Sequence, residues 1–187
     1  DIDWYPEFLA GTLTHSRSAL EAQYGASVVQ SNGVLPWAIG ETVATLTTQF
    51  QAQSWSAAAL TIADLCHYVG DANQPLHCTE NYNGQLTGNS GIHSRYESTM
   101  LGQHVGELST PAMSVAYYAE PVETAFDVIT ASWADVAPIL VADNEALDAA
   151  GGSYSTTYYN ALWASTMALT QARLDTATVL TASLVYT

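Results

Sequence analysis

The chain has 187 residues, 48% hydrophobic and only 11% charged, so it is long enough for one folded domain and too apolar to be intrinsically disordered. Its 18 acidic residues outnumber three arginines, there is no lysine, and the formal net charge of −15 excludes a protein that holds nucleic acid through a basic surface. We expect no membrane-spanning segment, because no uninterrupted apolar run approaches roughly 20 residues, and the first residues are unlike a signal peptide.

Apolar residues recur at helical spacing through most of the chain, and no useful stretch alternates as a strand does. We therefore predict an all-α fold, a compact bundle of about six helices formed by residues 1–187 as a single domain. Residues 1–12 read as irregular. Caps, prolines and glycines set the helix bounds. The predicted helices cover 15–30, 36–53, 55–71, 92–108, 121–147 with a kink at Pro138, and 154–185.

Between the third and fourth predicted helices, residues 72–91 are rich in Asn, Gly, Gln and Pro and read as a long ordered loop. Long ordered loops in compact domains usually carry function. The segment is therefore the first place to look for a site.

Scarce histidines gather around this loop. His67 and Asp71 are four residues apart on one predicted helix, and His93 and Glu97 repeat that spacing on the next, so each pair shares a helix face. His77 follows the proline that ends the earlier helix. Three imidazoles and two carboxylates are the ligand types that zinc takes. A single pair is a weak signal, but two pairs bracketing a third histidine favour a metal site over an unoccupied surface.

Other polar residues near the pattern are less distinctive. Asp64 lies one turn before His67 and would orient that imidazole from outside the metal's own ligands, although a plain surface aspartate fits equally well. His15 and His104 have no such neighbours and are taken as structural. Cys66 and Cys78 are close enough in sequence to pair in an oxidising compartment, and this spacing alone fixes no geometry.

The stretch "LCHYVGDANQPLH" followed by "GIHSRYE" resembles the zinc-dependent phospholipase C and single-strand-specific nuclease superfamily, whose core pattern is H-x(3)-D-x(5)-H and then H-x(3)-[DE]. All five positions match in order and spacing. The segments "TENYNGQLTGN" and "GVLPWAI" are similar to a bacterial branch of that superfamily. The resemblance covers most of residues 20 to 100.

This resemblance implies a compact helical bundle that holds up to three zinc ions. His67 and Asp71 would bind the first ion, Asp71 would bridge to the third, and His77, His93 and Glu97 would hold the second. The ions would polarise a phosphodiester and activate the water that attacks phosphorus, with Asp71 and His67 as catalytic residues. The substrate would be a phospholipid or a single-stranded nucleic acid, and Glu97 together with the acidity favours the phospholipid.

Members of the superfamily also use zinc ligands from an N-terminal segment that this chain lacks. "DIDWYPEF" resembles the residues that follow the last of those ligands, so we expect the chain to be truncated at the N-terminus, and at the C-terminus, relative to the family. Two alternatives stay open: the missing segment is a separate, associated piece of the protein, or the molecule never had it. In either case one complete zinc site, at His77, His93 and Glu97, is expected in this chain.

The predicted function is that of a secreted, extracellular zinc-dependent phosphodiester hydrolase. A disulfide between Cys66 and Cys78 is expected to hold His77 in register, since the rival assignment, thiolate ligation, finds no sulfur ligand in the family. The alternative function is a non-catalytic extracellular binding or structural protein on the same fold with a residual zinc site. Its uncharged polar surface would suit self-assembly.

Overall fold

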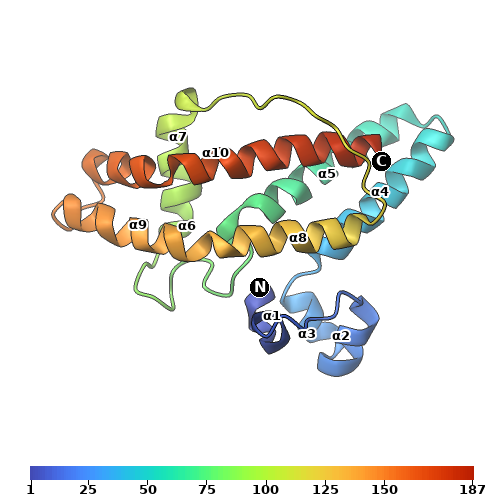
Figure 1. The fold of residues 1–187 in the computed structure, drawn as a ribbon, viewed down its shortest axis with the longest axis horizontal. Helices are drawn as coiled ribbons and strands as arrows, with labels where there is room; N and C mark the ends of the chain where they lie inside the picture. The colour runs from blue at the N-terminus through green and yellow to red at the C-terminus, as the bar shows by residue number, and fades with distance from the viewer.

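Four long stretches of helix form the body of the molecule. In the computed structural model, which describes residues 1–187, α10 (Thr156–Tyr186) runs antiparallel to α8 (Pro121–Ala134) and α9 (Val136–Ala149) (Figure 1). The hairpin of α4 (Leu35–Gln51) and α5 (Trp55–Asn73) packs against α8 and α10. The chain is 72% helical with no strand, which confirms the predicted all-α, compact fold.

Apolar spacing explains why the long helices pack as they do. In α4 the side chains of Ile39, Val43 and Leu46 recur every three or four residues, and all three are buried. Helix α8 approaches α4 so closely that a Cβ atom at Gly40 would lie 2.5 Å from Cγ2 of Val122. A larger residue at this crossing would therefore force the side chain of Val122 or the helices to shift.

The buried apolar side chains form two clusters. One lies between α4, α5, α8 and the end of α10, and the other joins α9 and the start of α10 to residues 92–100. The indole of Trp133 packs against both clusters, so the two are continuous at the junction of α8 and α9. The candidate metal ligands lie beside this junction, at the end of α5 and on the segment that begins at Ile92.

Several helices are interrupted where continuous ones were predicted. The helix predicted at 15–30 is divided into α2 (Arg17–Tyr24) and α3 (Ala26–Ser31), because Gly25 adopts a φ of 90°. The predicted helix at 121–147 breaks at Asp135 rather than at Pro138. A proline has no amide to bond the carbonyl four residues earlier, so the interruption falls about one turn before the proline.

Two predictions about irregular structure were partly wrong. Residues 1–12 contain a 3₁₀ turn at Ile2–Trp4 and the short helix α1 (Pro6–Leu9), and α5 continues to Asn73, two residues past its predicted end. The connection that follows α5 contains the 3₁₀ turn Pro75–His77 and otherwise no regular element before Gly91.

The segment predicted as one helix at 92–108 has four short parts. α6 (Ile92–Ser94) leads into a π-helical turn (Arg95–Met100), then α7 (Leu101–His104) and a 3₁₀ turn at Val105–Glu107. π-Helical turns are rare and occur frequently at functional sites. This one contains Glu97.

The combined stretch Pro121–Ala149 is long and apolar enough to cross a membrane, by length and composition only, which the sequence pattern did not single out. Buried core helices of soluble proteins pass the same test. Here 44% of that window is buried inside the protein.

Candidate metal centre

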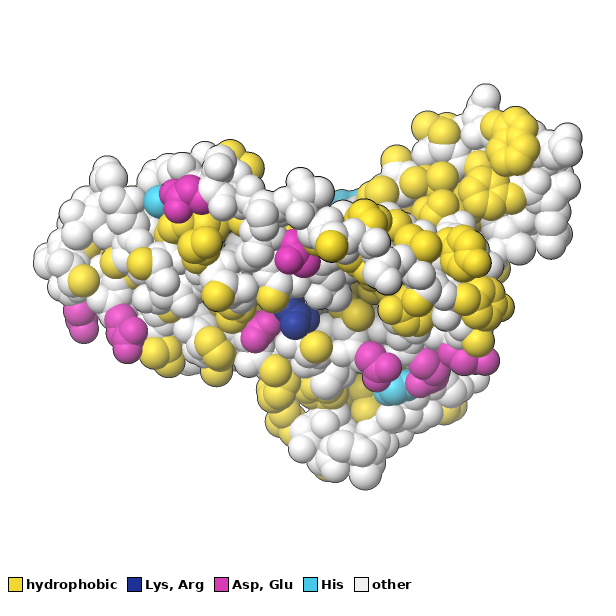
Figure 2. All heavy atoms as spheres, turned by 45° about the horizontal axis from the view of Figure 1, so that its top comes forward, with side chains coloured by type: hydrophobic (Ala, Val, Ile, Leu, Met, Phe, Trp, Pro, Cys, Tyr) yellow, Lys and Arg dark blue, Asp and Glu magenta, His cyan; other side chains and the backbone are white.

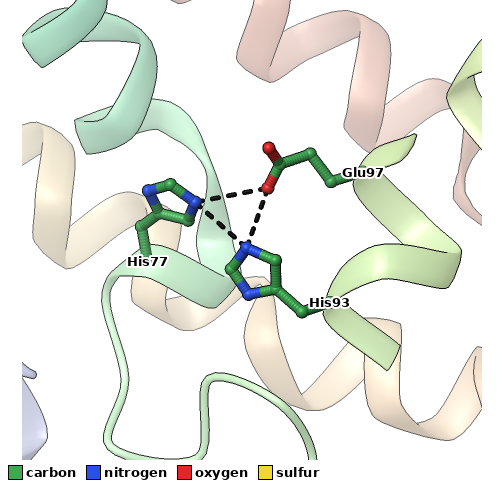
Figure 3. Close-up of side chains that lie close together, drawn as sticks. All are labelled: His77, His93 and Glu97. Carbon is green, nitrogen blue, oxygen red and sulfur yellow. Dashed lines mark hydrogen bonds and ion pairs between the residues drawn. The ribbon is translucent and has the colours of Figure 1, made fainter. Parts of the chain in front are cut away.

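Three side chains point toward one another next to the end of α5 (Figure 3). Nε2 of His77 lies 3.2 Å from Nε2 of His93 and 3.2 Å from Oε2 of Glu97, and Nε2 of His93 lies 2.9 Å from the same carboxylate oxygen. The sequence pattern placed these residues in one metal site, and the structure brings them together.

The end of α5 positions His77. Gln74, at the C-terminus of the helix, accepts a hydrogen bond from the backbone N–H of Leu76 at 2.7 Å and thereby starts the 3₁₀ turn that carries His77. Nδ1 of His77 lies 3.3 Å from Oδ1 of Asp71. This carboxylate lies on the side of the ring away from Glu97, and Nε2 faces His93 and Glu97.

His93 is oriented in the same way from the other end of the loop. Its Nδ1 lies 3.1 Å from the backbone carbonyl oxygen of Tyr82, which can only accept a hydrogen bond. Nδ1 therefore carries the proton, and Nε2 is the free nitrogen. Both imidazoles thus direct Nε2 toward Glu97.

Glu97 is held as a carboxylate. Nε2 of Gln74 donates a hydrogen bond to Oε2 of Glu97 at 2.8 Å. Burial works against ionisation of Glu97, but this hydrogen bond and the nearby rings of His77 and His93 outweigh it, so the pKa of Glu97 is lowered below its usual value. The site therefore combines two imidazole nitrogens with one negatively charged oxygen.

A buried polar cluster fixes the loop that joins the two histidines. The guanidinium of Arg95 donates hydrogen bonds to Asp143 at 3.0 Å and to the backbone carbonyl of Asn89 at 3.1 Å. The side chain of Asn89 donates to Asp143 at 2.8 Å, and the hydroxyl of Tyr158 donates to Asp143 as well. Since Asp143 and Tyr158 lie on α9 and α10, the end of the loop is tied to the body of the bundle shortly before His93 is reached.

The three ligand atoms have the spacing that one zinc ion requires. Tetrahedral zinc with bonds of about 2.0–2.1 Å separates its ligand atoms by about 3.3 Å. The separations here are 2.9, 3.2 and 3.2 Å, so the triangle matches one face of such a tetrahedron and leaves the fourth position free. Three protein ligands with one free position is the composition of catalytic zinc sites.

His67 and Asp71 do not join this group as ligands. The side chain of His67 is 70% exposed, and its Nε2 lies 3.4 Å from Oδ2 of Asp71. Asp71 thus lies between His67 and His77 and contacts the nitrogen of His77 that faces away from Glu97. The side chain of Asp64 is exposed and makes no hydrogen bond or ion pair, so its predicted contact with His67 is not formed; Asp71 is the carboxylate beside His67.

The predicted disulfide between Cys66 and Cys78 is not formed, and both cysteines are free. Cys66 lies on the exposed side of α5. The thiol of Cys78 is buried and donates weak hydrogen bonds to the backbone carbonyls of Ala72 and Gln74. The two sulfur atoms therefore lie in different surroundings, one in solvent and one in the core, which the spacing in sequence could not show.

Three residues at the site were not predicted from the sequence. Gln74 bonds Glu97, the carbonyl of Tyr82 orients His93, and Arg173 of α10 lines a pocket beside the ligands. Gln74 precedes a proline at a predicted helix end, which was a usable signal for a side chain that caps the next turn. A backbone carbonyl and an arginine on a helix far along the chain leave no local signal.

The chain matches no protein-family model, no curated protein and no solved structure.

Proposed function

We propose that this protein is a zinc-dependent phosphodiester hydrolase of the phospholipase C and single-strand-specific nuclease superfamily, in which His77, His93 and Glu97 hold zinc. The proposal rests on one observation: the convergence of two Nε2 atoms and a carboxylate oxygen at the spacing of a zinc tetrahedron, with the fourth position free. The match of all five residues to the superfamily pattern supports the same assignment.

The charges of the site suit an anionic substrate. Zinc bound there would act as a Lewis acid toward a phosphoryl oxygen and would lower the pKa of a water molecule. With two neutral imidazoles and one carboxylate as ligands, the loaded site keeps a positive charge. That charge attracts a phosphodiester into a molecule whose surface is otherwise acidic, as the scattered magenta side chains in Figure 2 illustrate.

The chain's own residues keep the site ready for that role. Asp71 lies against Nδ1 of His77 and the carbonyl of Tyr82 accepts a hydrogen bond from Nδ1 of His93, so both Nε2 atoms face the site, and Gln74 restrains the carboxylate of Glu97. Asp71 and His67 remain the proposed ligands of a further zinc ion, and as a pair they are incomplete. We propose that this second position fills only when ligands come from an associated segment or a second molecule.

Substrate and location follow as parts of the same proposal. A phospholipid suits the acidic, lysine-free surface better than a single-stranded nucleic acid, because strand binding relies on a positively charged groove. Secretion is supported by the composition alone, since both cysteines are free.

Zinc analysis tests this function directly. The dialysed protein is expected to retain close to one zinc per molecule, His93→Ala to lose it, and His67→Ala to keep it, because only His93 belongs to the triangle. His104→Ala is the matched control, since His104 lies outside the site against Glu107. Inductively coupled plasma mass spectrometry measures the stoichiometry. A value of zero or of three zinc ions would contradict the assignment.

Turnover separates the two functions considered. The zinc-loaded protein is expected to hydrolyse a chromogenic phosphodiester, bis(4-nitrophenyl) phosphate, and to lose that activity with a chelator or with His93→Ala. Retention of one zinc without any turnover, in the presence and absence of added zinc, would leave the non-catalytic alternative with a stabilising zinc.

A further inference from the structure

A pocket of about 190 Å³ opens directly beside the proposed zinc ligands. It lies between the end of α5, the π-helical turn and the middle of α10. His77 and Glu97 form part of its wall, together with Asp71 and Gln74. The opposite wall belongs to α10 and includes Thr170, Arg173 and Leu174. A group held in this pocket therefore lies beside His77 and Glu97.

Arg173 is the only permanently charged cation in the pocket. The chain has three such residues. Arg95 is committed to the buried cluster with Asp143, and Arg17 pairs with Glu21 on α2 at 2.8 Å. The molecule has a net charge of −15, so a positively charged side chain beside the proposed metal ligands is unusual in this chain. Its position raises the question of what it binds.

The guanidinium of Arg173 is only partly used by the protein. Its Nε lies 3.1 Å from Oδ2 of Asp135, yet this ion pair lacks hydrogen-bond geometry, and Nε is a buried donor without an acceptor. Nη1 donates a long hydrogen bond of 3.4 Å to the hydroxyl of Ser132, and no hydrogen bond from Nη2 is formed. A guanidinium carries five N–H donors, and the bond to Ser132 uses one of them.

Asp135 is a weak competitor for this cation. Burial raises the pKa of Asp135 by more than the charge of Arg173 lowers it, so the carboxylate is held in an unfavourable environment for its charge. The side chains of Arg173 and Asp135 are 20% and 25% exposed, which leaves the pair accessible to a small anion from solvent.

We propose that Arg173 is a phosphate-binding residue, which receives the non-bridging oxygens of the substrate's phosphate in the pocket between α5 and α10 while the phosphorus faces the His77, His93 and Glu97 site. This inference rests on the proposed function and names the residue that binds its phosphate. Arginine suits the role because its planar fork pairs with two phosphate oxygens at once. The apolar side of the pocket, at Leu101 and Leu174, would receive the adjoining ester group.

Calorimetric titration of the zinc-loaded protein with inorganic phosphate tests the inference. Arg173→Gln is expected to weaken phosphate binding by about tenfold or more, because a charge-assisted, two-point contact is removed. Arg173→Lys is expected to restore only part of the affinity, since a lysine is a point charge without the fork. Arg17→Gln removes the same charge far from the pocket and is the matched control.

Asp135→Asn distinguishes binding from a merely structural ion pair. If Arg173 binds phosphate, removal of the competing carboxylate releases the guanidinium and phosphate affinity is expected to rise by about threefold or more. If the pair only holds α8 to α10, both Asp135→Asn and Arg173→Gln destabilise the protein and neither strengthens phosphate binding. Thermal unfolding of each variant shows which of the two occurs.

The outcomes separate this inference from the function on which it rests. Failure of the protein to bind zinc overturns the proposed function, and the inference falls with it. If zinc binds and the phosphodiester is hydrolysed while Arg173→Gln leaves the phosphate dissociation constant and KM unchanged, the function stands and this inference is overturned. An increase in KM at constant zinc affinity supports it.

Discussion

The carboxylate of Asp143 is a buried charge whose partners are all side chains of the protein. Its side chain is 2% exposed, and it accepts hydrogen bonds from Arg95, Asn89 and Tyr158. Asp143→Ala would leave the buried guanidinium of Arg95 without a counter-charge, and we expect a loss of about 3–5 kcal/mol in the free energy of unfolding. Urea denaturation followed by circular dichroism measures it.

Asp148→Ala is the matched control for that loss. Asp148 lies on the same helix, is exposed, and makes no side-chain hydrogen bond or ion pair. We expect its removal to change stability by about 0.5 kcal/mol or less. Equal losses in the two variants would mean that the buried cluster does not anchor the loop.

At the scale of elements, the connection between α5 and α6 depends on close backbone contact at Gly84. This residue has a φ of +71°, and a Cβ atom there would lie 2.6 Å from the backbone oxygen of Asn89. We expect Gly84→Ala to cost about 1–3 kcal/mol and to weaken zinc binding, because the displaced loop carries the carbonyl of Tyr82 that orients His93. Urea denaturation and a competitive zinc titration measure the two effects.

Gly88→Ala separates the effect of a steric clash from the effect of backbone strain. Gly88 also has a positive φ, +84°, but a Cβ atom added there would meet no other atom within 4 Å. The variant should therefore show only the strain of the left-handed backbone, about 1 kcal/mol, and bind zinc as the parent does. Similar zinc affinities for the two alanine variants would contradict the role given to the loop.

Local sequence predicted the elements where local energetics decide them. The caps and apolar periods of α4, α5 and α10 placed these helices to within about three residues. Gly25 divides α2 from α3 through its backbone conformation, a signal that was present in the sequence and was not used. The π-helical turn had no local signal, because neighbouring elements rather than intrinsic propensity decide whether a turn widens.

In the site, too, local sequence predicted some contacts and packing decided the others. Spacing on a helix brought His93 and Glu97 together, and the proline before His77 predicted that the chain would turn there. The position of Asp71 against the far side of His77 depends on how that turn closes, so the spacing alone could not show it. The burial of Cys78 likewise follows from packing in the core of the bundle, which a spacing of cysteines does not encode.

At the scale of the whole molecule, a buried thiol and a buried phenol make the stability of the fold decrease at alkaline pH. Burial raises the pKa of Cys78 from 9.0 to about 12 and that of Tyr96 from 10.0 to about 12. The folded protein keeps protons that the unfolded chain releases. The contribution of these two groups to stability is thus fully present below pH 9 and is lost as the pH rises toward 12.

We expect the free energy of unfolding to fall by about 2 kcal/mol between about pH 9 and pH 11 from Cys78 alone, since the limiting slope is about 1.4 kcal/mol per pH unit. Cys78→Ala should flatten this part of the stability profile, while Cys66→Ala, which changes an exposed thiol, should leave it unchanged. Urea denaturation at a series of pH values measures the slope. Identical profiles for the parent and Cys78→Ala would show that the buried thiol does not take part.

The π-helical turn at Arg95–Met100 has a consequence for how many residues this segment can hold. Such a turn holds one residue more than an α-helical turn, so it corresponds to a single-residue insertion that was accommodated without breaking the helix. Because the wider turn absorbs the extra residue, Met100 keeps its buried place against Thr166 of α10. Deleting one residue within the turn would remove the bulge and leave the helix after it facing the same way. Deleting a residue from the ordinary helical turn that follows would instead rotate every later residue of the segment by about 100°.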